Sequence, residues 1–246
     1  MRILIALSLA GIAAGCGQSV PSDLGAGNGS STATTLEHAT SEAGAPAASP
    51  VAPRAGQRAR ELINPDQTTV VLLYFDLASL PVPIEQSLEN DMRVRMAPPA
   101  DKPAQRERVR QELEAGLAGV RGVGTLRLTL QANLSEYDST YGEFTVRALG
   151  PGSVVEYQAL GQKVKLNFGN ARTAQVWRVP AAQAQAVRDR VGFAGDVSVD
   201  ALLAVRDVHA APEGGSITVD VIEYELRENR GGTLLGRVQL ANRGNT

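Results

Sequence analysis

The residues best suited to chemistry lie in two short stretches of the second half of the chain. In the first, between positions 136 and 143, Glu136, Asp138 and Glu143 stand close to Gly142. Carboxylate oxygens beside a glycine that allows a sharp turn are ligands and geometry that Ca²⁺ can use. The spacing matches no EF-hand loop, however, and these residue types are common in turns. We therefore interpret the stretch as a turn and predict no metal site.

The second stretch consists of Asp207 and His209. Alternate residues of a strand share one face, so the two side chains would lie on the same side of a strand. A carboxylate beside a histidine can position a general base, but the nucleophile would have to be a distant Ser or Thr. The sequence has no Gly-x-Ser-x-Gly motif, no phosphate-binding loop and no dinucleotide-binding fingerprint. Two histidines, His38 and His209, and one cysteine are too few for an ordinary zinc site. We predict a protein that is not an enzyme and holds no cofactor.

The single cysteine, Cys16, ends a segment that is typical of a secretory signal peptide. Met1 and Arg2 give it a basic start, residues 3–14 form an apolar run, and small residues lead into the cysteine. The run has twelve residues, whereas a transmembrane helix needs roughly 20. Ordinary cleavage to a soluble periplasmic protein is the main alternative, since Ala13 and Gly15 also suit a signal peptidase that adds no lipid.

The sequence Ala13-Ala14-Gly15-Cys16 resembles the lipobox of bacterial lipoproteins, with Ala13 where those signals usually have leucine. The resemblance implies that residues 1–15 are a signal peptide that is removed, and that Cys16 is lipidated. Two or three acyl chains such as palmitate make a stable membrane anchor. Gly17 stands where an aspartate would favour the inner membrane, so the resemblance implies the periplasmic face of the outer membrane.

Residues 16–56 are rich in Gly, Ser, Ala, Thr and Pro, and they show no hydrophobic periodicity. This composition is typical of a disordered tether, and we interpret His38 as one of its solvated residues. A tether of about 40 residues would reach roughly 35 Å. The net charge of −2 gives no electrostatic reason to expect nucleic acid as a partner. No cysteine follows Cys16, so residues 57–246 must depend on the hydrophobic core of a single domain.

Hydrophobic periodicity predicts an α+β domain with a largely antiparallel sheet, meander-like or sandwich-like, and about three covering helices. The apolar run at 70–75 predicts a strand buried on both faces within 67–77. Apolar residues every fourth position predict one helix with a core-facing stripe of Ile84, Leu88, Met92 and Met96. A second helix is predicted from the N-cap Asp101 to Val120. Predicted ion pairs on these helices are Glu89–Arg93, Arg108–Glu112 and Arg110–Glu114.

Alternation of apolar and polar residues predicts the later strands, of which 126–134 has the clearest pattern. Between 143 and 179 it predicts a meander, with a loop at 149–152 and another at 169–171. The meander places Val146 opposite Val155, Phe144 opposite Tyr157, Leu166 opposite Ala174 and Val164 opposite Val176. Pro180 opens a third predicted helix, and Trp177 is interpreted as a core residue that packs against it. Further strands are predicted at 197–205, at 217–226 with a β-bulge at Val221-Ile222, and at 233–240.

The leading functional hypothesis is a membrane-anchored envelope lipoprotein that acts as a non-enzymatic binding module in the periplasm. It follows from an anchor at Cys16, a long tether and a domain without catalytic motifs, and it implies an envelope protein as partner. One alternative is a carrier or sensor of a small apolar ligand held between sheet and helices. A further alternative is a hydrolase that uses His209 or the carboxylates of 136–143.

Overall fold

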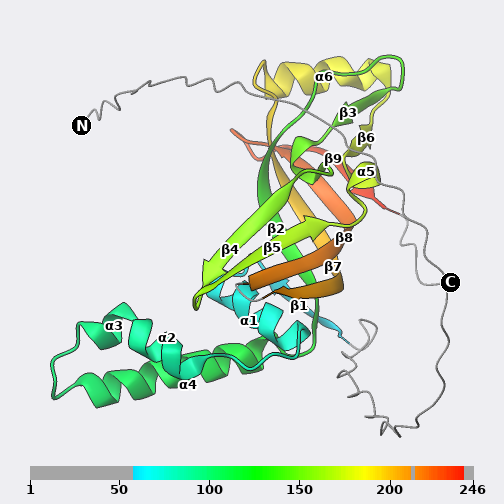
Figure 1. Ribbon diagram of the computed structural model, residues 1–246. Coiled ribbons are helices and arrows are strands. Elements are labelled where there is room, and N and C mark those ends of the chain that lie inside the picture. The colour runs from blue at the N-terminus through cyan, green and yellow to red at the C-terminus, as the bar shows by residue number, and fades with distance from the viewer. Residues whose placement is uncertain (1–57, 212–213, 241–246) are drawn as a thin grey trace, which may run out of the picture. The chain divides into compact units, whose positions relative to one another are not determined.

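The computed structural model describes residues 58–211 and 214–240 (Figure 1). They belong to the second of two units into which the chain divides, Ala48–Thr246. The predicted signal peptide at 1–15, the lipidation site Cys16 and the predicted tether at 16–56 with His38 lie outside the described residues.

The described residues form an α+β fold around a seven-stranded sheet, which confirms the predicted fold class. The strand order is β1-β2-β7-β8-β5-β4, and β9 pairs with β8 beyond the end of β5. Only the β1–β2 and β5–β8 pairs of this sheet are parallel. Its strands are β1 (Arg60–Ile63), β2 (Val123–Asn133), β4 (Val154–Ala159), β5 (Gln162–Phe168), β7 (Asp196–Ala211), β8 (Gly214–Glu228) and β9 (Leu234–Gln239).

Residues Gln67–Leu77 form helix α1, so the predicted strand at this position is wrong. Asp66 begins the helix, because its carboxylate accepts a hydrogen bond from the Thr69 backbone N–H at 2.7 Å. The helix packs between α4 (Lys102–Val120) and strands β4 and β5, and it is buried almost all round. A segment without a wet face shows no periodicity, so its short apolar run looks the same in a strand and in a buried helix.

The predicted helix over 84–96 is two helices, α2 (Ile84–Asn90) and α3 (Met92–Arg95). The chain is extended at Asp91, whose carboxylate caps α3 by accepting from the Arg93 backbone N–H at 2.7 Å. The break turns Met92 and Met96 out of the predicted stripe, and they are 64% and 76% exposed. A small core of Leu88, Val94, Val109 and Leu113 instead joins α2 and α3 to α4.

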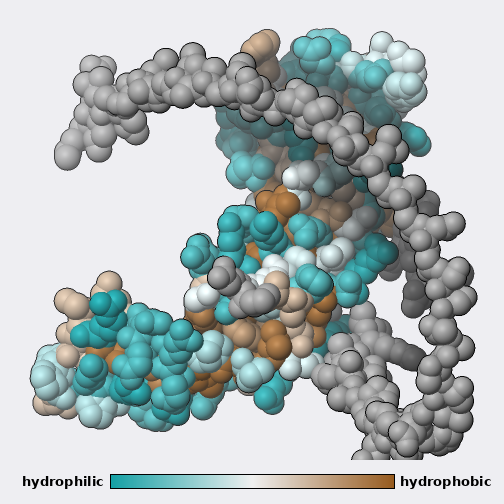
Figure 2. Space-filling view, viewed as in Figure 1, coloured by the Kyte–Doolittle hydropathy of each residue, from teal (hydrophilic) through white to brown (hydrophobic). Residues whose placement is uncertain are grey.

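Helix α4 begins one residue after Asp101 and ends at Val120, as the sequence predicts, although the Asp101 side chain makes no capping hydrogen bond. None of the three predicted ion pairs forms within the described residues. Four of their six members pair between helices instead, because α2 and α3 lie against α4 and bring opposite charges close. These cross-helix pairs are Arg93–Glu112 and Arg110–Glu85, both at 2.7 Å, and Arg106–Glu89. Figure 2 shows this three-helix arm as largely hydrophilic on the face in view.

Replacing Met92 or Met96 with serine is therefore expected to change the free energy of unfolding by less than about 0.5 kcal/mol, because an exposed side chain leaves no cavity. Urea denaturation followed by circular dichroism measures the change. Val94→Ala is the matched control in the same short helix, and its fully buried side chain should make it clearly more destabilising. A larger loss for the two methionine variants than for Val94→Ala would contradict the exposed position of both methionines.

The meander predicted over 143–179 is wrong in its pairing. Strand β3 (Glu143–Thr145) pairs with β6 (Val176–Arg178) in a separate two-stranded sheet, so Phe144 lies opposite Trp177. Strand β4 pairs with β5, which places Val155 opposite Leu166 and Tyr157 opposite Val164. The turn at Leu160-Gly161 explains this hairpin, because both residues have positive φ, as a two-residue type I′ turn requires. Residues Ala171–Ala174, predicted as the end of the loop at 169–171 and the start of the last meander strand, form the short helix α5.

The remaining predicted elements are confirmed. The predicted strand at 126–134 corresponds to β2, which ends at Asn133, and to Leu134, which forms an isolated β-bridge with Val146. Pro180 directly precedes helix α6 (Ala181–Val191). Strands β7 and β8 form a long antiparallel hairpin. The β-bulge is present, since Leu202 lies opposite Glu223 and Leu203 opposite Val221, which leaves Ile222 as the extra residue. Figure 1 shows α6 and the β3–β6 sheet near one another.

Candidate functional site

The carboxylates of 136–143 do not converge on one point. Asp138 accepts hydrogen bonds from the backbone N–H groups of Thr140, at 2.8 Å, and Tyr141, at 3.2 Å. Glu143 faces Arg178 across β3 and β6, with 3.7 Å between charged atoms. The interpretation of this stretch as a turn is thus confirmed. The described residues contain no group of three or more His, Cys, Asp or Glu side chains that could hold a metal ion.

Asp207 and His209 lie near the end of β7, and both are exposed. Asp207 accepts a hydrogen bond from the adjacent Val208 backbone N–H at 2.9 Å. Ser216 of β8 lies opposite His209, but no hydrogen bond among the described residues joins His209 to Asp207 or to Ser216. Asp207, His209 and Ser216 thus lie near one another at the end of the β7–β8 hairpin, but no hydrogen bond among the described residues orients the imidazole of His209 toward either of the other two.

Trp177 is a core residue, as predicted, with 5% of its surface exposed. Its ring stacks on Phe144, with 5.5 Å between the ring centroids. Strand β9 lies directly against its indole ring. A Cβ atom added at Gly236 would lie 2.7 Å from Trp177 Cζ2. Glycine at position 236 therefore lets β9 approach the indole ring closely.

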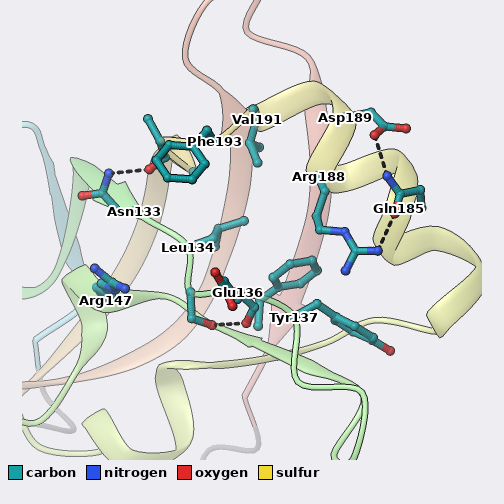
Figure 3. A pocket seen from close by; sticks show the side chains of 15 residues that line it. Asn133, Leu134, Glu136, Tyr137, Arg147, Gln185, Arg188, Asp189, Val191 and Phe193 are labelled. Carbon is teal, nitrogen blue, oxygen red and sulfur yellow. Dashed lines mark hydrogen bonds between the residues drawn. The ribbon is translucent and has the colours of Figure 1, made fainter.

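An open hollow beside α6 is the candidate functional site, here called the α6 hollow (Figure 3). Its volume is about 840 Å³. One wall is the end of α6 with the loop that follows it, and the other is the chain between the end of β2 and β3, together with Arg147. Its labelled side chains in Figure 3 are Asn133, Leu134, Glu136, Tyr137, Arg147, Gln185, Arg188, Asp189, Val191 and Phe193.

The loop after α6 is fixed to the end of β2. The Leu134 backbone N–H donates to the Gly195 carbonyl oxygen at 2.9 Å, and Asn133 Nδ2 donates to the Ala194 carbonyl oxygen at 3.1 Å. Gly192 and Gly195 both have positive φ, so the chain can turn tightly on either side of Phe193. The loop therefore holds a fully exposed phenyl ring at the rim of the hollow.

Aromatic and charged groups share the floor of the α6 hollow. The Arg188 guanidinium lies over the Tyr137 ring, 5.9 Å from its centroid, in a cation–π contact. The Tyr137 hydroxyl donates to the Val179 carbonyl oxygen at 2.9 Å, which fixes the ring. Two cations, Arg147 and Arg188, and two carboxylates, Glu136 and Asp189, line the hollow. This balance suits a surface with both apolar and hydrogen-bonding groups rather than a highly charged ligand.

Sequence reasoning missed this hollow, because it joins chain segments about 50 residues apart. The one local signal is Gly192-Phe193-Ala194-Gly195, in which glycines flank an aromatic residue at a helix end. Among the described residues no helix is both long and apolar enough to cross a bilayer. No protein-family model, curated protein or solved structure matches the chain.

Proposed function

We propose that the chain is a non-enzymatic binding module of the bacterial cell envelope, and that the α6 hollow contacts an envelope protein. The observation that carries the proposal is Phe193, a fully exposed phenyl ring at the rim of a hollow. Exposed aromatic residues beside a concave surface are typical of protein contact sites, where an aromatic side chain often supplies much of the binding energy. Tyr137 and Arg188 add the residue types enriched at such sites.

The membrane anchor belongs to the same proposal. It rests on the lipobox-like Ala13-Ala14-Gly15-Cys16 and on the tether at 16–56, which would let the domain search for a partner from a membrane. The proposed location is the periplasmic face of the outer membrane.

A carrier of a small ligand is the second candidate, favoured by the hollow's volume of about 840 Å³. Small-molecule sites are typically about 300–1,000 Å³, but they enclose the ligand and are mostly apolar. Four charged side chains line the α6 hollow, and Phe193 at its rim is exposed to solvent. These features favour a protein surface over an apolar ligand.

Photo-crosslinking in intact cells tests the proposal, with a benzoylphenylalanine placed at Phe193. The matched control places it at Tyr141, another exposed aromatic residue that does not line the hollow. We expect one discrete protein adduct at position 193 and none at position 141. Equal labelling at both positions, or none at 193, would contradict a protein site at the hollow. A small molecule retained by the purified chain in native mass spectrometry, and lost in Tyr137→Ala, would support the carrier instead.

The anchor is tested in the same cells by the intact mass of the mature N-terminal peptide from the membrane fraction. We expect the mass of acyl chains on Cys16, absent from the Cys16→Ala variant. An unmodified N-terminus in the wild-type chain would remove the anchor from the proposal.

A further inference from the structure

We propose that a groove between strands β6 and β9 binds an extended, acidic segment of a partner protein as an additional β-strand. This β6–β9 groove has a volume of about 590 Å³. Its walls are residues of α5 and β6 on one side and residues 237–240 on the other. No residue lines both this groove and the α6 hollow, so the two sites are separate.

One edge of strand β9 is unpaired, because in the described residues β9 pairs with β8 alone. The Leu240 backbone N–H donates to the Ile222 carbonyl oxygen at 2.8 Å, so the main-chain groups of Leu240 point toward β8. Successive residues of an antiparallel strand direct their main-chain groups alternately toward and away from the paired strand. The N–H and C=O groups of Arg237 and Gln239 therefore point away from β8. Within the part of the chain that the structure describes, these groups form a free strand edge, on which an extended peptide can form main-chain hydrogen bonds.

The facing wall offers a second set of main-chain groups. Strand β6 pairs with β3, and the flanking hydrogen bonds run from Val146 N–H to Gln175 O and from Val179 N–H to Gly142 O. Alternation then turns the main-chain groups of Val176 and Arg178 away from β3. The Tyr224 hydroxyl of β8 donates to the Val176 carbonyl oxygen at 3.5 Å, so this acceptor is already used and the edge lies over the main sheet.

The residues that line the groove carry positive charge. Three arginines, Arg172, Arg178 and Arg237, line the groove, and no Asp or Glu is among its lining residues. Arg172 has no ion-pair partner among the described residues, and Arg178 is 83% exposed. Arg237 donates to Glu225, and this bond, with one from Arg227, holds the pKa of the Glu225 carboxyl below its usual range. Carboxylates spaced along an extended segment would complement the two arginines that are less engaged.

A second copy of the chain is a poor occupant by the same reasoning. Strand β9 carries Arg237 and has no acidic residue, so pairing two β9 edges would place like charges together. The charge pattern therefore selects a different, acidic partner.

The single tryptophan, Trp177, lines the groove and reports on its occupancy. The experiment titrates the full chain with a blocked ten-residue peptide of alternating Glu and Val and follows Trp177 emission. We expect the Glu–Val peptide to bind saturably and a Lys–Val peptide not to bind. A Glu–Pro peptide should not bind either, because proline lacks a backbone N–H and the peptide has half as many main-chain donors. Arg178→Glu should weaken binding at least about tenfold, since it reverses a charge at the groove. Arg147→Glu, the same change in the α6 hollow, should leave it unchanged.

Gln239→Pro tests whether the peptide binds through main-chain hydrogen bonds to β9. The Gln239 N–H points away from β8, so proline there removes an outward donor while the β8–β9 ladder stays intact. We expect weaker binding with an unchanged circular dichroism spectrum. Equal binding of the Lys–Val peptide, or no effect of Arg178→Glu, would overturn the acidic specificity, and full binding by Gln239→Pro would overturn strand addition. Light scattering that showed a dimer disrupted by Gln239→Pro would assign the edge to a second copy. None of these outcomes depends on the crosslinking at Phe193.

Discussion

Replacing Tyr74 with alanine is expected to lower the free energy of unfolding by about 3–5 kcal/mol, the range for removing a buried aromatic ring. Tyr74 lies on α1 and is only 1% exposed. Its ring packs against Phe75, with 5.7 Å between ring centroids, and against the backbone at Gly215, where an added Cβ would lie 2.7 Å from Tyr74 Cε2. Its hydroxyl donates to the Gly214 carbonyl oxygen at 2.6 Å. Alanine would leave both a cavity and a buried acceptor without its donor.

Urea unfolding followed by far-ultraviolet circular dichroism measures this loss, with Tyr74→Phe as the matched control. Phenylalanine keeps the ring and removes only the hydroxyl, so it should cost about 1–3 kcal/mol. The total stability of a domain is about 5–15 kcal/mol, so the alanine variant should unfold at a much lower urea concentration. A cost for Tyr74→Ala below about 1 kcal/mol would contradict a central position of α1. Equal costs for the two variants would contradict the packing of the ring.

Asn170→Ala is expected to cost about 2–4 kcal/mol, because two hydrogen bonds to the main chain of a buried residue are lost. One edge of β8 pairs with β7. Along its other edge, β5 pairs with β8 as far as Val219, and β9 pairs with it from Glu223 onward. The Asn170 side chain fills the gap between them. Its Nδ2 donates to the Val221 carbonyl oxygen at 2.8 Å, and its Oδ1 accepts from the Val221 N–H at 2.9 Å. One amide side chain thus takes the place of a paired strand residue at the bulge.

The measurement combines chemical unfolding with hydrogen exchange at the Val221 amide. In Asn170→Ala that amide should exchange faster than its neighbours in β8, which remain paired. Asn170→Asp is the control, because its carboxylate keeps an acceptor for the Val221 N–H and loses the donor to the carbonyl oxygen. We expect Asn170→Asp to protect the amide better than Asn170→Ala does. Unchanged exchange in both variants would show that Asn170 does not complete the sheet.

Elements with one buried and one wet face could be predicted from the sequence alone. Alternation in 126–134 and 197–205 marks β2 and β7, because a strand with one buried face repeats every two residues. The stripe through Val109 and Leu113 marks α4 in the same way, with the helical period. The bulge was located by two adjacent apolar residues, Val221 and Ile222, which interrupt the alternation. The carboxylates of 136–143 were correctly assigned to a turn, since Asp138 caps it.

Features that depend on residues distant in the sequence could not be predicted in this way. Helix α1 is buried almost all round, so its sequence has no continuous wet face to set a period. Strand partners depend on which edges meet: β3 pairs with β6, whereas the Leu160-Gly161 turn joins β4 to β5. The α6 hollow and the β6–β9 groove arise where separate segments come together. Local periodicity reports which side of an element is buried, whereas the choice of neighbour is settled by the packing of the whole domain.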